Sequence, residues 1–289
     1  MKTIAISGMS GFVGTHLSQY LTQQGYQLIK ITRNDLKNID KLTAKIEKVE
    51  ALINLAGANI IQRWTKSYKK VLYSSRIDST QMLVKAMSKA QIPPKVFIST
   101  SAIGIYKNNR LYNETSTELE NNFLANLCKD WETEAKKAEA LNIRTVICRF
   151  GIILAKDGGA LQKMLMPFKL GLGGVIGTGQ QAVSFIHIHD LKRFYLHAIR
   201  HEEVEGIYNM TTPYPTTNKG LTKALGKVLN RPSILPLPTF VVKLALGQGS
   251  IVLTDGQSVL PKRVLESSFH FEFESINEVM EDLFLNSSG

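Results

Sequence analysis

The chain has 289 residues, of which 44% are hydrophobic and 20% charged, so it can bury a large core and is too apolar for a disordered protein. Its only cysteines, Cys128 and Cys148, form no disulfide framework, which makes a reducing, cytoplasmic compartment the default expectation. The longest apolar runs are far shorter than the roughly 18 residues of a membrane span, and the first residues lack a secretory signal. We therefore expect a soluble protein with no membrane partner.

The formal net charge of +11 raises the question of a nucleic-acid partner, because clustered Lys and Arg attract phosphates. The densest basic stretch, RWTKSYKKVLYSSR at 63–76, combines five basic residues with three aromatic ones. At helical spacing its apolar members would dock while its lysines stay in solvent, and no familiar nucleic-acid motif accompanies it. We expect no nucleic-acid partner, and a phosphorylated small ligand accounts for the charge equally well.

Short β-rich runs alternate with longer helical patterns along the first half of the chain. In chain order, the predicted strands are KTIAIS (2–7), QLIKITR (27–33), EALINLA (50–56), KVFIST (95–100) and RTVICRF (144–150), with predicted helices over 12–24, 66–89 and 121–141. This alternation predicts βαβ units, and hence an α/β fold with a doubly wound parallel sheet of the Rossmann type.

After Phe150 the sequence changes to glycine- and proline-rich segments, which predict a smaller C-terminal substrate lobe. No linker divides the chain, so we expect the lobe to be interleaved with the sheet domain. We assign 1–153 plus about 183–212 to the Rossmann domain, and 154–182 and 213–289 to the substrate lobe.

Three glycines spaced three residues apart, Gly8, Gly11 and Gly14, follow the first predicted strand and open a helical pattern. This is the context of a dinucleotide-binding motif, which needs a tight turn, close approach of the backbone and a helix N-terminus facing the pyrophosphate. A P-loop is excluded because no Gly-Lys-Ser/Thr follows. A second glycine-rich stretch, 171–179, precedes a predicted strand, and we interpret it as a loop bordering the substrate.

The end of the second strand selects the cofactor, because a carboxylate there binds the ribose 2′-hydroxyl whereas an Arg accommodates a 2′-phosphate. Arg33 occupies this place, and Asp35 follows two residues later. The sequence therefore favours NADP over NAD. The alternative is that Arg33 is an ordinary surface arginine at a strand end.

Several motifs resemble the extended short-chain dehydrogenase/reductases: the glycine motif, INLAG at 53–57, STSAIGIY at 99–106, RFG at 149–151 and FIHIHDL at 185–191. Further motifs, RWT, SRIDST, LCKDWE, DGGAL, LGLGG, TTN and QSVLPKR, are similar to an atypical branch of nucleoside-diphosphate-sugar epimerase-like proteins. That branch has a characteristic C-terminal domain of unknown function, and some members carry a cell-division-inhibitor label. The resemblance spans nearly the whole chain and implies an NADP-binding Rossmann domain with a small C-terminal lobe.

The resemblance also implies which residues bind the cofactor. Position by position, the pyrophosphate falls to Gly8, Ser10, Gly11, Phe12 and Val13, the adenosine phosphate to Thr32 and Arg33, and the adenine and ribose to Asn54, Leu55, Ala56 and Gly57. Ser75 and Arg76 match a helix region that contacts the cofactor, and Thr100 with Ser101 matches the strand beside the nicotinamide. For Ser75 and Arg76 an ordinary place on a helix surface is an equal alternative.

The usual catalytic pair of this superfamily, a Tyr with a Lys four residues later on one helix face, is missing. Counting back from Glu132 places the two positions on Leu124 and Cys128. A Lys ammonium lowers the pKa of the phenol so that it can exchange a proton, and neither residue can do this. We predict that Ser101 polarises a carbonyl and that Tyr106 is the acid, with simple packing of Tyr106 as the alternative.

Metal and thiol chemistry are not expected. His187 and His189 would project from one side of a predicted strand, but no Cys or second His pair stands nearby in sequence. Cys128 is more in keeping with a small buried thiol than with a nucleophile.

Two classes of function remain open. The first is an NADP(H)-dependent oxidoreductase or epimerase acting on a small carbonyl or sugar-nucleotide substrate with an altered proton donor. The second is a non-catalytic NADPH-binding regulator that acts through protein partners. We favour the enzyme.

Overall fold

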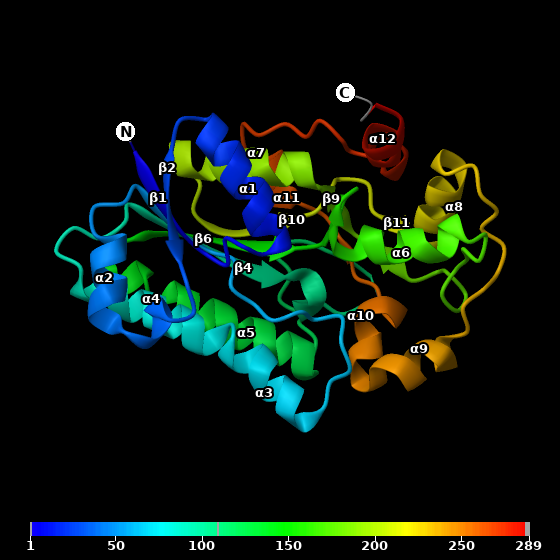
Figure 1. Cartoon of the computed structure of the whole chain (residues 1–289), viewed down its shortest axis with the longest axis horizontal. Helices are drawn as coiled ribbons and strands as arrows, with labels where there is room; N and C mark the ends of the chain where they lie inside the picture. Colours follow the sequence, from blue (N-terminus) through cyan, green and yellow to red (C-terminus); the bar gives the residue numbers. More distant parts are fainter. Residues whose placement is uncertain (1, 109, 287–289) are drawn as a thin grey trace.

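Six parallel strands form the central sheet of the computed structural model, in the order β10-β6-β4-β3-β1-β2 (Figure 1). The structure describes residues 2–108 and 110–286. From β1 the chain passes to β2 on one side and then to β3 on the other, and ligands of open α/β sheets bind at such a reversal, beyond the carboxyl ends of the strands. The strands are β1 (Thr3–Ser7), β2 (Gln27–Ile31), β3 (Ala51–Asn54), β4 (Val96–Ala102), β6 (Arg144–Phe150) and β10 (Gly206–Met210).

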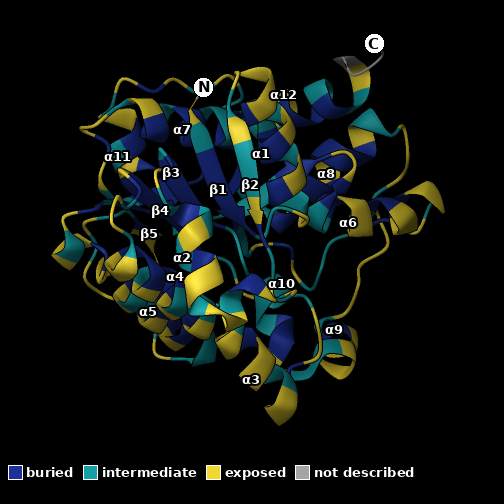
Figure 2. Ribbon diagram, turned by 60° about the vertical axis from the view of Figure 1, so that its left-hand side comes forward, coloured by how far each residue is buried: buried dark blue, intermediate teal, exposed yellow. Residues whose placement is uncertain are grey.

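Helices cover both faces of this sheet, because side chains alternate along each strand. Ile4 and Ile6 of β1 pack in the cluster that contains α1 and α7, whereas Ala5 packs with α2, α4 and α5. The strands β1, β3 and β4 are largely buried, as a parallel sheet with two covered faces requires (Figure 2). The helices are α1 (Phe12–Gln23), α7 (Ile188–Arg200) and α11 (Lys262–Leu265) on one face, and α2 (Ile39–Ile46), α3 (Lys66–Ser74), α4 (Ile77–Lys89) and α5 (Phe123–Lys136) on the other. The predicted Rossmann fold is confirmed.

A smaller lobe lies beyond the carboxyl ends of the strands and has its own core, which includes Leu161, Phe185, Leu221, Leu225 and Met280 (Figure 1). Its helices are α6 (Gly159–Lys169), α8 (Asn218–Val228), α9 (Thr239–Leu246), α10 (Ile251–Thr254) and α12 (Ile276–Glu281). Three short strand pairs join it to the sheet domain: β7 (Ile152–Ala155) with β9 (Phe185–His187), β8 (Ala182–Val183) with β11 (Thr216–Thr217), and β5 (Leu111–Tyr112) with β12 (Ser258–Val259). The short helical turns are η1 (Asp35–Lys37), η2 (Ile103–Ile105), η3 (Glu139–Leu141), η4 (Gly247–Ser250) and η5 (Asp282–Asn286).

Some sequence-based boundaries are wrong. The helix predicted over 66–89 is two helices, α3 and α4, separated at Ser75 and Arg76. His187 and His189 do not share a strand, because α7 begins at Ile188 and the Nδ1 atom of His187 accepts the His189 backbone N–H at 3.1 Å as the helix cap. None of the described helices has the length and apolar character needed to cross a membrane.

Candidate functional site

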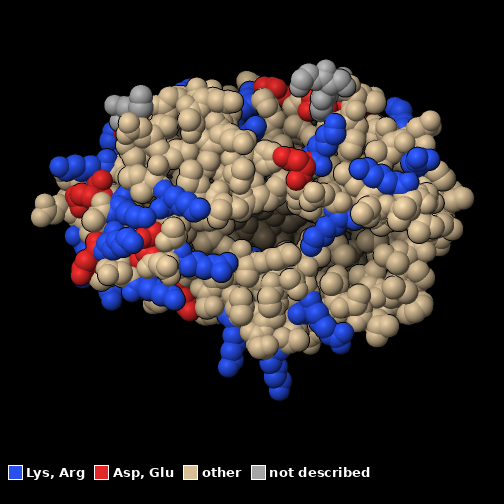
Figure 3. All heavy atoms as spheres, viewed as in Figure 1, with Lys and Arg blue, Asp and Glu red and all other residues tan. Residues whose placement is uncertain are grey.

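A cavity of about 440 Å³ opens beyond the carboxyl ends of β1, β3, β4 and β6, between the sheet and the smaller lobe. The space-filling view shows the surface hollowed near the centre of this face, with Lys and Arg side chains near its rim (Figure 3). This is the place where the reversal of strand order predicts a ligand.

The glycine turn after β1 forms one wall of the cavity. Gly8 has a φ of +81°, and a Cβ there would lie 2.6 Å from the backbone of Leu55. A Cβ on Gly14 would lie 2.3 Å from the carbonyl oxygen of Gly8, whereas one on Gly11 would meet only that oxygen, at 3.2 Å. Gly8 and Gly14 therefore let the strand, turn and helix pack, and Gly11 keeps the cavity wall free of a side chain.

The N-terminus of α1 supplies unpaired backbone donors at this wall. Gly11 caps the helix without a side chain, so the first N–H groups have no side-chain acceptor. Phe12 and Val13 line the cavity beside it, while Ser10 is exposed in the turn and does not line it. A pyrophosphate fits this combination of free donors, positive helix end and close backbone.

The segment after β3 forms the neighbouring wall with Leu55, Ala56 and Gly57. Asn54 is fully buried beneath it and donates from Nδ2 to Thr80 Oγ1 at 2.8 Å, while its Oδ1 accepts the Ala56 N–H at 3.2 Å. Asn54 thus fixes the wall from behind and does not itself line the cavity.

Arg76 and Ser75 lie at the break between α3 and α4, next to this wall. Arg76 lines the cavity, donates from Nη2 to the Ala58 carbonyl at 2.9 Å and stacks over the Trp131 ring at 5.3 Å. Burial lowers the pKa of the Arg76 guanidinium, and no carboxylate of the described residues pairs with it. Ser75 supports the wall from outside, where its Oγ accepts the Ala58 N–H at 3.0 Å.

The carboxylate that follows β2, Asp35, is buried and paired within the protein. Asp35 Oδ2 accepts the N–H and the hydroxyl of Thr32 at 2.7 and 2.6 Å and forms an ion pair with Lys45 at 2.7 Å. Burial alone would raise the pKa of Asp35, but hydrogen bonds from Lys45 and Thr32 outweigh it and hold that pKa well below its usual range. Arg33 is exposed, and its guanidinium forms no ion pair within the described part of the chain.

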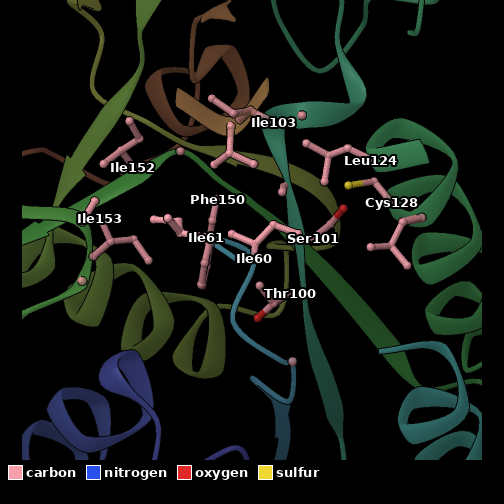
Figure 4. A pocket seen from close by; sticks show the side chains of 18 of the residues that line it. Ile60, Ile61, Thr100, Ser101, Ile103, Leu124, Cys128, Phe150, Ile152 and Ile153 are labelled. Carbon is pink, nitrogen blue, oxygen red and sulfur yellow. The ribbon is translucent and has the colours of Figure 1, made fainter. Parts of the chain in front are cut away.

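Thr100 and Ser101, at the end of β4, line the cavity on its inner side (Figure 4). The Thr100 hydroxyl donates to the Asn54 carbonyl at 2.9 Å, and the Ser101 hydroxyl donates to Glu132 Oε1 at 2.7 Å. Glu132 also forms a bidentate, buried ion pair with Arg149, with both N–O distances at 2.7 Å. Ser101 is therefore held in place by a charge-balanced pair.

Tyr106 lies beyond this ion pair and does not line the cavity. It is fully buried, accepts from Arg149 Nη1 at 2.6 Å and donates to Asn209 Oδ1 at 3.0 Å. Burial raises the pKa of its phenol. The geometry therefore argues against the predicted role of Tyr106 as the acid, because its hydroxyl points into the protein, and fits the packed alternative.

Leu124 and Cys128 of α5 face the cavity from the side of Ser101 (Figure 4). Burial raises the pKa of the Cys128 thiol to about 12, so it is neutral and supplies no positive field. The described lining contains no Tyr, Lys or His, and Arg76 and Asp255 are its charged side chains. Most of the remaining side chains are apolar, among them Ile60, Ile61, Ile103, Phe150, Ile152 and Ile153.

Glu132 and Arg149 have no predicted role in the sequence, although the structure places both beside Ser101. Arg149 alone gave a local signal, because it interrupts the otherwise apolar run TVICRF and such charges are buried in pairs, whereas Glu132 stands in the charged stretch KDWETEAKK. In the described residues, no group of three or more His, Cys, Asp or Glu is placed to hold a metal ion.

The doubly wound sheet, the glycine turn at its strand reversal and the adjoining cavity define a dinucleotide-binding protein of the Rossmann class. The model of the NAD dependent epimerase/dehydratase family matches residues 4–211, and that of a domain of unknown function, DUF1731, matches residues 237–283. The chain belongs to the NAD dependent epimerase/dehydratase family.

Relatives of similar length support this assignment. The chain is 35% identical over 295 residues to the epimerase family protein YfhF of Bacillus subtilis, covering 97% of each protein. The crystal structure of the human epimerase family protein SDR39U1 (isoform 2) with NADPH matches with a TM-score of 0.91 and 33% identity over 98% of this chain and 99% of that one. UDP-glucuronic acid 4-epimerase from Bacillus cereus, in complex with UDP-glucuronic acid and NAD, matches with a TM-score of 0.76 at 17% identity over 98% of each chain, which shows the shared fold alone.

Proposed function

We propose that the protein is an NADP(H)-dependent oxidoreductase that acts on a small, apolar carbonyl compound in this cavity. The lining of the cavity carries the proposal. Its hydroxyls at Thr100 and Ser101 stand beside apolar side chains, and its charged groups are few.

The glycine wall suits the pyrophosphate of the cofactor, and Leu55 to Gly57 suit its ribose and adenine. The human relative crystallised with NADPH supports NADP as the cofactor. So does the end of β2, where Asp35 is paired with lysines and Arg33 is free to meet a 2′-phosphate. When bound, the cofactor supplies the hydride chemistry.

Ser101 is the residue we assign to orienting and polarising the substrate carbonyl. Its acceptor, Glu132 Oε1, also receives a hydrogen bond from Arg149 at 2.7 Å. The carboxylate therefore stays charge-balanced when the Ser101 hydroxyl turns toward a carbonyl oxygen in the cavity. The described lining contains no Tyr, Lys or His that could donate the proton, so we expect slow turnover or a proton drawn from water.

A small carbonyl fits this lining better than a sugar nucleotide does. A nucleoside diphosphate carries two phosphates, which proteins pair with Arg, Lys or helix N-termini. Arg76 is the one basic side chain in the described lining, and it lies on the cofactor side, against Gly57. The epimerase alternative would also need the acid–base pair that Leu124 and Cys128 replace.

The test has two readouts. Oxidation of NADPH, followed as loss of its absorbance band at about 340 nm, reports reduction of a panel of apolar aldehydes, ketones and quinones. Chromatographic detection of the epimerised sugar reports turnover of UDP-sugars, because epimerisation leaves no net change in the cofactor. We expect turnover with an apolar carbonyl. Ser101→Ala should lower kcat at least about tenfold with unchanged NADPH affinity, and the matched control Cys128→Ser should stay within a few-fold of wild type. Turnover with UDP-sugars alone would refute the substrate class.

The regulator is a second candidate, because the described lining contains no Tyr, Lys or His that could exchange a proton with a substrate. A regulator should bind NADPH tightly, leave it unoxidised with every carbonyl of the panel and convert no UDP-sugar to its epimer. That result would replace the enzyme with the regulator.

A further inference from the structure

The free end of the smaller lobe exposes large apolar side chains that the fold does not cover. We define the lobe face by Leu170, Leu172, Ile234, Leu235, Phe240 and Leu244, which are 47–79% exposed. Ile234, Phe240 and Leu244 are 79%, 69% and 73% exposed. Single exposed apolar residues are common on protein surfaces, but a group of them marks an interaction surface.

The residues of the lobe face come from three neighbouring segments. Backbone hydrogen bonds join the loop after α6 to the loop before α9, from Leu235 N to Gly173 O at 3.3 Å and from Leu237 N to Val175 O at 2.8 Å. Phe240 and Leu244 lie four residues apart in α9, so they share one side of that helix. These hydrogen bonds place the loop after α6 beside the loop that leads into α9.

The same part of the chain contains basic residues and no acidic ones. Neither 158–189 nor 206–254 contains an Asp or Glu, and together they contain seven Lys and Arg residues. Six of these, all but Lys227, are exposed and form no ion pair within the described residues: Lys163, Lys169, Lys219, Lys223, Arg231 and Lys243. The space-filling view shows this lobe, at its right, as tan surface with scattered blue and no red over α6, α8 and α9 (Figure 3).

We propose that the lobe face attaches the protein to the surface of an anionic lipid bilayer. Exposed apolar side chains bordered by lysines match an interface of acyl chains and negative headgroups. A second copy of the chain is a poorer occupant, because two such faces would bring uncompensated lysines against each other. The sequence-based expectation of no membrane partner rested on the length of a spanning segment, which surface attachment does not require.

Attachment here would hold the cavity close to the bilayer. Arg63 Nη1 donates to the Leu244 carbonyl at 3.1 Å and ties the end of α9 to the loop that carries Ile60 and Ile61 into the cavity wall. The proposal stands apart from the catalytic role, since it concerns the surface and not the chemistry of the site.

The experiment is sedimentation of the full chain with vesicles of phosphatidylcholine, with and without phosphatidylglycerol, at low and high ionic strength. We expect binding to the anionic vesicles that weakens with salt. Phe240→Ser with Leu244→Ser, and separately Lys169→Glu with Lys243→Glu, should each lower the partition coefficient at least about tenfold.

Matched controls separate the lobe face from general properties of the protein. Ile92→Ser removes an apolar side chain elsewhere that is 52% exposed, and Lys70→Glu with Lys85→Glu makes the same change in net charge on α3 and α4. Both should bind vesicles like wild type, and all variants should keep the wild-type melting temperature. Absence of binding to anionic vesicles, or equal loss in variants and controls, would overturn the proposal. So would a dimer in light scattering that only the Phe240 and Leu244 variant dissociates.

Discussion

An added methyl group should have different effects at two glycines of the same turn: it should lower stability at Gly14 and weaken cofactor binding at Gly11. In Gly14→Ala the new Cβ would lie 2.3 Å from the Gly8 oxygen and 2.7 Å from backbone atoms of Met9. In Gly11→Ala it would meet only the Gly8 oxygen, at 3.2 Å, and the Gly11 φ of −79° is open to any residue. The first change therefore acts on the fold, and the second acts on the cavity.

The magnitudes follow from these contacts. Helix propensity favours Ala over Gly by about 1 kcal/mol, but overpacking against backbone costs about 1–3 kcal/mol or more, so Gly14→Ala should be destabilised overall. In a chain of this size each kcal/mol lowers Tm by about 2–4 °C. Gly11→Ala should melt close to wild type and bind NADPH at least about tenfold more weakly, or about 1.4 kcal/mol.

Thermal unfolding by circular dichroism and NADPH titration by calorimetry measure the two effects on the same samples. Wild-type NADPH affinity in a folded Gly11→Ala protein would refute the assignment of this turn to the pyrophosphate. The glycine-rich segment 171–179 would then be the next candidate for that contact.

Three further predictions concern charged side chains. Arg33→Ala should weaken NADPH binding by about 1.5–3 kcal/mol and leave NADH binding nearly unchanged; equal losses in titrations of both cofactors would contradict the 2′-phosphate role. Arg149→Met should lower the free energy of unfolding, measured in urea, by about 3–5 kcal/mol, because it leaves Glu132 buried without its ion-pair partner. Adding Glu132→Leu should restore part of the lost stability, and an unchanged stability would contradict the argument. Asp35→Asn should lower Tm at neutral pH, and the difference should shrink as pH falls below about 4. A carboxyl whose folded pKa is depressed contributes its full stability above its unfolded pKa and loses that contribution as pH falls toward the folded pKa; a difference that is constant with pH would contradict this.

The sheet and the glycine turn were predictable because their signals are local. A strand such as VFISTSA of β4 is a short, β-branched run with turns at its ends, and the glycine spacing lies within one turn and the helix after it. The division of 66–89 into two helices was not predictable from periodicity. It depends on contacts of Ser75 and Arg76 with Ala58, which lies 17 and 18 residues earlier in the chain.

The position of Tyr106 was missed for a related reason. Its place after the strand expected beside the nicotinamide suggested that it reaches the cofactor, but its direction is set by Arg149 and Asn209, from β6 and β10. The ion pair of Arg149 with Glu132 likewise joins a strand to a helix and appears in no local pattern. The residues that orient Ser101 therefore become visible only when β4, β6 and α5 are placed together.

Leu124 and Cys128 belong to an apolar wall of the cavity that several packed residues build together. Leu124 packs onto Gly104, where an added Cβ would lie 2.6 Å from Leu124 Cδ2, so the space at this position is matched to an aliphatic side chain. Cys128, one helical turn further along α5, is buried in the same apolar cluster as Ile103 and Tyr106. A lysine there would lose hydration without gaining an acidic partner beyond Glu132, which Arg149 already neutralises. The apolar wall is thus built from several mutually packed residues. This packing supports the proposed apolar carbonyl substrate over a sugar nucleotide.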